Sequence, residues 1–144
     1  MKIIKCKTDK TFSELVSIFE NVNILELESI FNMSKYFQYI DFVDKDGKNG
    51  ILAIVADSYQ KRLEDFLSKN SIGFNTTDIS KDIFFDNLVD SNFTNETGCD
   101  ITHDVEKFFK YFKENYTTKD DILDKIIEKG VNSLTEFDKS ILEK

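Results

Sequence analysis

Residues 36–77 read YFQYIDFVDKDGKNGILAIVADSYQKRLEDFLSKNSIGFNTT, and this stretch determines the predicted fold. It begins with an aromatic run and continues, after the turn signal Asp46-Gly47, with a wholly apolar run, a pattern typical of two strands joined by a hairpin. An amphipathic segment and a short run of β-forming residues follow. The predicted elements are strands over residues 36–43 and 51–55, a helix that begins at residue 57 and is broken at residue 70, and a strand over residues 72–76.

The first 35 residues add one strand and one interrupted helix to this unit. Residues 2–7 are rich in Ile and alternate weakly, which predicts a strand. Thr11 and Glu14 have the spacing of a capping box, and the apolar stripe after them predicts a helix that is broken by a second cap at Asn23 and ends near Met33. The resulting order is that of the ferredoxin-like fold, an antiparallel sheet of four strands whose first and third strands are central.

Beyond the predicted sheet, the chain is expected to be mainly helical. Apolar stripes at helical spacing cover residues 103–115 and 119–129, and Leu123 and Ile127 belong to the face predicted to point inward. A capping box at residues 133–136 predicts a final helix. We therefore expect an α+β protein with a ferredoxin-like βαββαβ core (1–80), an acidic connecting segment (81–102) and a C-terminal helical appendage of about three helices (103–144), packed on the core as one domain.

The last part of the chain resembles a known motif. The sequence DILDKIIEKGVNSLTEFDKSILEK, residues 121–144, is similar to a short helical hairpin found at the C-termini of many Bacteroidetes proteins, including rhomboid-type membrane proteins. The usual motif is richer in Glu and Lys where this chain has Phe137 and Asp138. The resemblance implies a bacterial or phage lineage and carries no activity or functional residue. The matching residues are Ile122, Leu123, Ile126, Lys129, Gly130, Ser133, Leu134, Thr135, Phe137 and Leu142.

Charge and hydropathy restrict the classes of partner. The 144-residue chain has a formal net charge of −8 and a pI of about 4.7. Direct binding to nucleic acid or to an anionic membrane depends on clustered Lys and Arg, so this charge argues against both. No run approaches the roughly 20 apolar residues of a membrane span, and the N-terminus lacks the pattern of a signal peptide. We expect a cytoplasmic protein whose partner, if any, has a basic surface.

Acidic residues gather between the predicted sheet and the predicted helices. The window of residues 82–104 contains no Lys or Arg. Two interpretations remain open: a solvated acidic loop, or a docking strip that meets basic side chains of a partner and steers the encounter. The candidate partner-binding residues are Asp82, Asp86, Asp90, Glu96, Asp100 and Asp104.

The sequence contains no complete catalytic or metal-binding motif. Cys99 and the only histidine, His103, have the spacing of half a zinc site, but with Cys6 they supply at most three of the four ligands that a structural site needs. The same Cys and His could form a nucleophile pair, although no glycine-rich turn provides oxyanion donors. Residues 44–49 lack the third short-spaced acid and the bidentate Glu of a calcium loop. We therefore predict no enzymatic activity, no cofactor and no metal.

The aromatic strand over residues 36–43 decides between the remaining functions, because both of its faces are apolar. Either the C-terminal helices cover the second face or a partner does. The primary hypothesis is a small acidic protein-binding protein of the inhibitor, immunity or phage anti-defence (anti-CRISPR-like) type, with a target such as a nucleic-acid-binding protein. The alternative is an intracellular ferredoxin-like adaptor or regulatory domain that acts as a homodimer.

Overall fold

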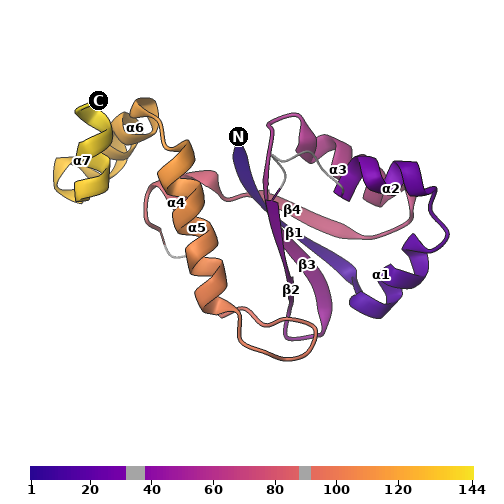
Figure 1. The fold of residues 1–144 in the computed structure, drawn as a ribbon. Helices are drawn as coiled ribbons and strands as arrows, with labels where there is room; N and C mark the ends of the chain where they lie inside the picture. Colours follow the sequence, from indigo (N-terminus) through magenta and orange to yellow (C-terminus); the bar gives the residue numbers. More distant parts are fainter. Residues whose placement is uncertain (32–37, 88–91) are drawn as a thin grey trace.

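The computed structural model describes residues 1–31, 38–87 and 92–144, in which a four-stranded sheet lies between two groups of helices (Figure 1). The predicted α+β class is therefore confirmed. In chain order the elements are β1 (Lys2–Thr11), α1 (Phe12–Phe19), α2 (Ile24–Phe31), β2 (Gln38–Val43), β3 (Lys48–Val55), α3 (Tyr59–Lys69), β4 (Phe74–Asp78), α4 (Ser80–Phe84), α5 (Thr102–Tyr116), α6 (Lys119–Lys129), the 3₁₀ helix η1 (Val131–Ser133) and α7 (Glu136–Leu142).

The sheet has the strand order β2-β3-β1-β4, and every neighbouring pair is antiparallel. β1 and β3 are thus the central strands, and the register between them pairs Ile4 with Ala53. The predicted strand residues Tyr36 and Phe37 and the predicted helix end at Met33 lie outside the described residues. β2 and β4 form the two edges of the sheet, so the apolar run 51–55 of β3 has a strand on each side.

The hairpin between β2 and β3 is built around one aspartate. The Asp44 Oδ1 atom accepts hydrogen bonds from the backbone N–H groups of Asp46, at 2.8 Å, and Lys48, at 2.9 Å. Gly47 occupies the left-handed region with a φ of +78°, which a side chain would strain. The hairpin turn that Asp46-Gly47 predicts is therefore present, and the Asp44 side chain stabilises it through these hydrogen bonds.

The apolar run of β3 supplies both faces of the sheet. Ile51, Ala53 and Val55 belong to one buried cluster, whereas Leu52 and Ile54 belong to the other. Side chains of a strand alternate between its faces, so a strand with helices on both sides has no polar position. Each fully buried aliphatic side chain of this kind stabilises the fold by roughly 1.5–3 kcal/mol relative to exposure.

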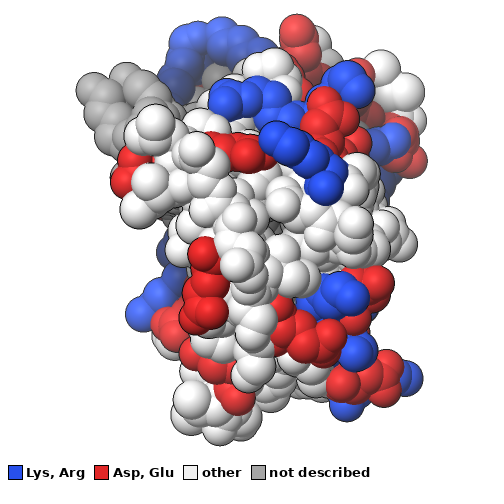
Figure 2. All heavy atoms as spheres, turned by 90° about the vertical axis from the view of Figure 1, so that its right-hand side faces the viewer, with Lys and Arg blue, Asp and Glu red and all other residues white. Residues whose placement is uncertain are grey.

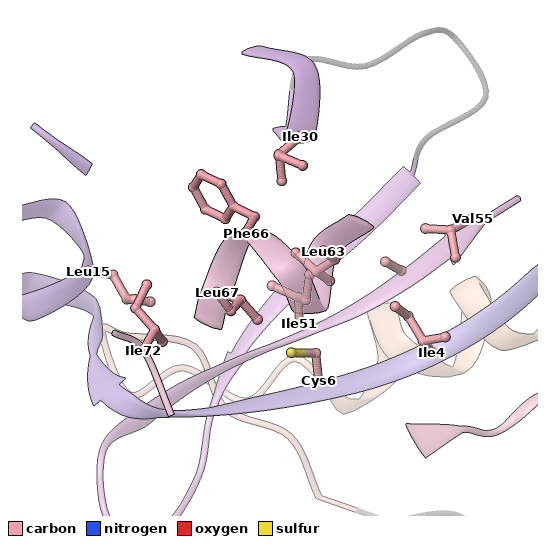
Figure 3. Packing of buried hydrophobic residues seen from close by; sticks show 11 residues of the cluster. Ile4, Cys6, Leu15, Ile30, Ile51, Val55, Leu63, Phe66, Leu67 and Ile72 are labelled. Atoms are coloured by element: carbon pink, nitrogen blue, oxygen red, sulfur yellow. The ribbon is translucent and has the colours of Figure 1, made fainter. Parts of the chain in front are cut away.

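Helices α1, α2 and α3 cover the first face, as Figure 3 shows from close by. Leu63 and Leu67 of α3 lie toward the strands, where Cys6 lies among aliphatic side chains, whereas Phe66 lies toward Ile30 of α2. Burial raises the pKa of the Cys6 thiol, which keeps it protonated and unreactive. The buried members of this cluster are Ile4, Cys6, Leu15, Ile30, Ile51, Ala53, Val55, Leu63, Phe66, Leu67 and Ile72.

Helices α4 and α5 cover the second face (Figure 1). Phe112 of α5 is fully buried and its ring stacks on Phe84 with 5.1 Å between centroids. Phe42 of β2 packs edge-on against Phe93 at 5.4 Å. The aromatic second strand is therefore covered on this side by the chain itself. The buried members of this cluster are Ile3, Phe42, Leu52, Ile54, Ile79, Ile83, Phe93, Val105, Phe108 and Phe112.

Among the described helices, capping boxes begin α1, α6 and α7. Thr11 and Glu14 form the predicted box at the start of α1, and two further boxes open α6 and α7. The predicted cap at residues 133–136 is wrong: Thr135 is the N-cap of α7, and Asp138 is its reciprocal partner. The hydroxyl of Ser133 instead donates to the Gly130 carbonyl oxygen, which places Ser133 in the preceding 3₁₀ turn.

The orientation of α6 also differs from the prediction. Leu123 and Ile127 are 50% and 81% exposed, whereas Ile122 is buried. The hairpin formed by α6 and α7 lies at the far end of the molecule from α1–α3 and contacts α4, so it buries only a narrow stripe (Figure 1). In the described part of the chain, no helix is both long enough and apolar enough to cross a membrane.

Candidate functional site

The predicted acidic strip is divided by the fold into separate groups. Asp82 lies in the first turn of α4 and accepts a hydrogen bond from the Asn87 amide at 3.1 Å. Asp90 is outside the described residues. Glu96, Asp100 and Asp104 are exposed on the loop before α5 and on its first turn, and we call these three residues the acidic tip. Asp86 lies elsewhere, against the C-terminal helices.

The loop that carries the acidic tip is held by side-chain hydrogen bonds. Thr94 bridges Val43 at the end of β2. The Asn95 Oδ1 atom accepts hydrogen bonds from the backbone N–H groups of Thr97 and Cys99 at 3.1 and 2.9 Å. These contacts fix the loop in one conformation beside the sheet edge.

The carboxylates of the acidic tip are not neutralised by the chain. The side chain of Thr102 first, and its backbone N–H at 2.8 Å second, stabilise the Asp100 carboxylate and lower its pKa. None of Glu96, Asp100 and Asp104 forms an ion pair with another described residue, although many other exposed acids do. The acidic tip is therefore a fixed, negatively charged surface.

Asp86 is the centre of a network of two lysines and two aspartates. It occupies the left-handed region with a φ of +57°, a conformation that Asp tolerates better than most residues. Its Oδ1 atom lies 2.6 Å from the Nζ of Lys113 on α5, and its Oδ2 atom lies 2.7 Å from the Nζ of Lys125 on α6. Lys125 in turn reaches the Oδ2 of Asp138 on α7 at 2.6 Å. We call these four residues the lysine–aspartate network.

The lysine–aspartate network is withdrawn from solvent at its C-terminal end. The Lys125 and Asp138 side chains are 2% and 0% exposed. Burial alone would raise the pKa of Asp138, but the hydrogen bond from Lys125 and the backbone N–H of Thr135 outweigh it and hold that pKa below its ordinary value. Burial likewise opposes the charge on Lys125, yet Asp138 and Asp86 raise its pKa above the ordinary value. Both groups are therefore charged at neutral pH.

The lysine–aspartate network joins helices and offers no site for chemistry. Its cations are paired, so neither lysine is available as a nucleophile or a base. Asp138 also caps α7, because its Oδ2 accepts from the Thr135 N–H at 3.0 Å. Sequence reasoning missed this network, although one signal was present: Lys125 falls between Ile122 and Ile126 on the inward stripe of α6.

The remaining candidates for chemistry stay apart. Cys99 and His103 are exposed, and Cys6 is buried in the first core cluster. The Cys99 sulfur accepts from the Thr97 hydroxyl at 3.4 Å, and no contact joins it to His103 in the described structure. Among residues 1–31, 38–87 and 92–144, no group of three His, Cys, Asp or Glu side chains is placed to hold a metal ion. Residues 44–49, which have part of the calcium-loop pattern, form the hairpin turn between β2 and β3.

A groove of about 260 Å³ lies between α1 and the strands β2 and β3. Leu15, Ile51 and Leu63 form its buried floor, while Phe12 and Val16 at its mouth are 43% and 40% exposed. Figure 2 shows the molecule from the side of α1–α3, where residues without charge cover the centre of the face and Asp and Glu side chains lie among them. Sequence reasoning did not identify this groove, since it depends on how far α1 stands from the sheet.

The chain was compared with known proteins in three ways. No protein-family model, no curated protein and no solved structure matches it.

Proposed function

We propose that the protein is a non-enzymatic protein-binding protein whose acidic tip docks on a basic surface of its partner. The observation that carries this proposal is that Glu96, Asp100 and Asp104 are exposed, unpaired with any described cation and presented on a loop fixed by Asn95. A fixed loop loses little conformational entropy on binding. Its uncompensated charge attracts a basic partner and accelerates the encounter.

The proposed partner is a protein with clustered Lys and Arg, such as a nucleic-acid-binding protein. Proteins that bind the phosphate backbone carry such clusters, and an acidic protein that covers the cluster would inhibit them. The net charge of −8 adds a long-range attraction to the local contacts of the acidic tip. We therefore propose a role of the inhibitor, immunity or phage anti-defence (anti-CRISPR-like) type.

We further propose a ferredoxin-like core for residues 1–80. The strand order β2-β3-β1-β4, with antiparallel neighbours and two βαβ connections through α1–α2 and α3, supports this class. The class by itself assigns no function, because it hosts many unrelated ones. In this protein, the sheet holds the end of β2 next to the loop that carries the acidic tip, through the bridge between Val43 and Thr94.

The test is retention of one partner by the immobilised full chain from an extract of the cells that encode it. The variant E96Q/D100N/D104N removes the charge of the acidic tip, and Asn at position 100 can still accept from Thr102. The matched control is D57N/D120N/E143Q, which removes the same charge from exposed acids on other parts of the surface.

We expect the wild type and the control to retain the same basic protein, with retention falling as salt rises because exposed charges are screened over about 10 Å at 0.1 M salt. The acidic-tip variant should lose that protein. Equal retention by all three forms, or no retained protein at low and at high salt, would refute the proposal.

A second candidate is the homodimeric adaptor, which the two edge strands favour. Within the described residues, β4 is paired only with β1, and β2 is paired on its outer side only at Val43, so both edges offer backbone groups to another strand. Light scattering of the full chain tests this candidate. A mass near 33.6 kDa, about twice the 16.8 kDa of one chain, supports the dimer, and a monomer mass at all concentrations excludes it.

A further inference from the structure

Two polar side chains face the apolar groove beside α1. Asp41 on β2 and Asn49 on β3 both line it. The register pairs Asp41 with Ile51 and Val43 with Asn49, so Asp41 and Asn49 lie diagonally across the two strands on the same face of the sheet. A carboxylate and an amide thus converge at the β2 end of an aliphatic floor.

Neither polar side chain has a partner within the described part of the chain. Asn49 is only 6% exposed, and its side-chain amide takes part in no hydrogen bond there. Asp41 has no ion pair or hydrogen bond there either, and burial together with the charge of Glu96 raises the pKa of its carboxyl group. Asp41 is half-buried, and neither its carboxyl nor the Asn49 amide is among the buried unsatisfied polar groups of the described structure, so the polar atoms of both reach solvent. An incoming ligand can therefore reach a carboxylate and an amide that no other described residue occupies.

A ligand matched to this end of the groove donates hydrogen bonds and carries positive charge. A carboxylate only accepts hydrogen bonds, and the amide oxygen of Asn49 is a second acceptor. An ammonium or guanidinium group satisfies both acceptors and offsets the negative charge of Asp41 and Glu96. The floor formed by Leu15 and Ile51 calls for an apolar group next to that cation.

We propose that the groove binds a Lys or Arg side chain of the protein partner, together with an adjacent apolar side chain that packs on the floor. This inference rests on the proposed function, because it concerns the same partner and gives it a second contact. Asp41 and Asn49 accept hydrogen bonds from the cation. The apolar side chain covers Phe12 and Val16, which remain exposed without it.

Two features favour a protein segment over a free amine. The groove of about 260 Å³ is smaller than the roughly 300–1,000 Å³ of ordinary small-ligand sites. Phe12 and Val16 line the groove and are still 43% and 40% exposed, so an apolar side chain of a protein segment can cover them. Moreover, the charge of Glu96 acts on Asp41, so these two carboxylates attract the same cation.

The direct test is an NMR titration of the full ¹⁵N-labelled chain with the probe N-acetyl-leucyl-arginine amide. We expect saturable shifts of the amides of Asp41, Asn49 and Ile51. The variant Asp41→Asn keeps the shape of the side chain and removes its charge, and should weaken binding about 10- to 100-fold, the usual effect of losing a hydrogen bond to a charged group. The control Asp65→Asn, on the exposed side of α3, should bind as the wild type does.

Matched probes separate the two parts of the proposal. N-acetyl-leucyl-citrulline amide lacks the positive charge, and N-acetyl-glycyl-arginine amide lacks the apolar side chain, so each should bind more weakly than the leucyl-arginine probe. If free butylamine binds as tightly as the leucyl-arginine probe, the groove is a site for small amines and the proposed protein segment is wrong. Unchanged binding by Asp41→Asn, or shifts confined to other residues, would overturn the inference.

The retention experiment distinguishes failure of this inference from failure of the proposed function. If E96Q/D100N/D104N loses the partner and Asp41→Asn retains it fully, the acidic tip is the docking site and the groove is not. If Asp41→Asn loses the partner and the acidic-tip variant retains it, the groove is the docking site and the acidic tip is not. Loss in both variants, with retention by Asp65→Asn, supports the two-contact surface.

Discussion

Lys125 and Asp138 form an ion pair of 2.6 Å whose two side chains are almost completely withdrawn from solvent. The pair joins α6 to α7, and Asp86 extends it to the segment after α4. Burying two charges costs free energy that only close, hydrogen-bonded contacts offset. Both charges are buried at the contact between α6 and α7, so removing one partner leaves the other charge buried without compensation.

Replacing Lys125 by Met should destabilise the protein by about 3–5 kcal/mol, the usual cost of leaving a buried charge without its partner. Urea unfolding measures the change. The double variant K125M/D138N removes both charges and should be more stable than K125M alone. The control Lys139→Met breaks an exposed pair with Glu136 and should change stability by less than about 1 kcal/mol. A loss in K125M no larger than that of the control would contradict this role of the network.

Acid should weaken the attachment of the C-terminal hairpin. Burial opposes ionisation of Asp86 and Asp138, but hydrogen bonds from the lysines hold the pKa of both carboxyl groups below the unfolded value of about 3.9. Their contribution to stability is therefore present above that pH and is lost as pH falls through the folded pKa values. Hydrogen exchange of the amides of α6 and α7 should accelerate relative to β3 in this range. Equal protection of both regions throughout would argue against the idea.

Asp41→Asn should make the free protein more stable at pH 7. Burial first, and repulsion from Glu96 second, raise the pKa of Asp41, so its ionised form opposes folding. A raised carboxyl pKa costs stability above the folded value, and this cost disappears as pH falls below the unfolded value. The gain should be less than about 1 kcal/mol, because the carboxyl is partly solvated. Thermal unfolding at pH 7 and at pH 3.5 measures it; a gain of the same size at both would point to another cause.

The orientation of α6 can be tested with Ile122 and Ile127, which are about 1.4 helical turns apart. Ile122 is buried, so Ile122→Ala should cost about 2–5 kcal/mol. Ile127 is 81% exposed, so Ile127→Ala should change stability by less than about 0.5 kcal/mol. Urea unfolding of the two variants gives the comparison. Similar losses in both would restore the inward position that the sequence predicts for Ile127.

Much of the fold was predictable from local sequence patterns. The unbroken apolar run of β3, the Asp46-Gly47 turn and the capping box at Thr11 each depend on residues close together in the chain. Their spacing has the period of a strand or a helix, and the sequence alone contains that information. The exposed acids of the tip could also be named, because a polar loop needs no distant partner.

The tertiary structure alone decided where individual charges lie. The inward position of Lys125 requires Asp86 and Asp138, which come from distant parts of the chain, so the helical pattern of α6 could not predict it. Likewise, Asp41 and Asn49 face one groove only because β2 and β3 pair in a particular register and α1 leaves part of that face open. Periodicity is local, whereas the desolvation and pairing of charges depend on which elements become neighbours after folding.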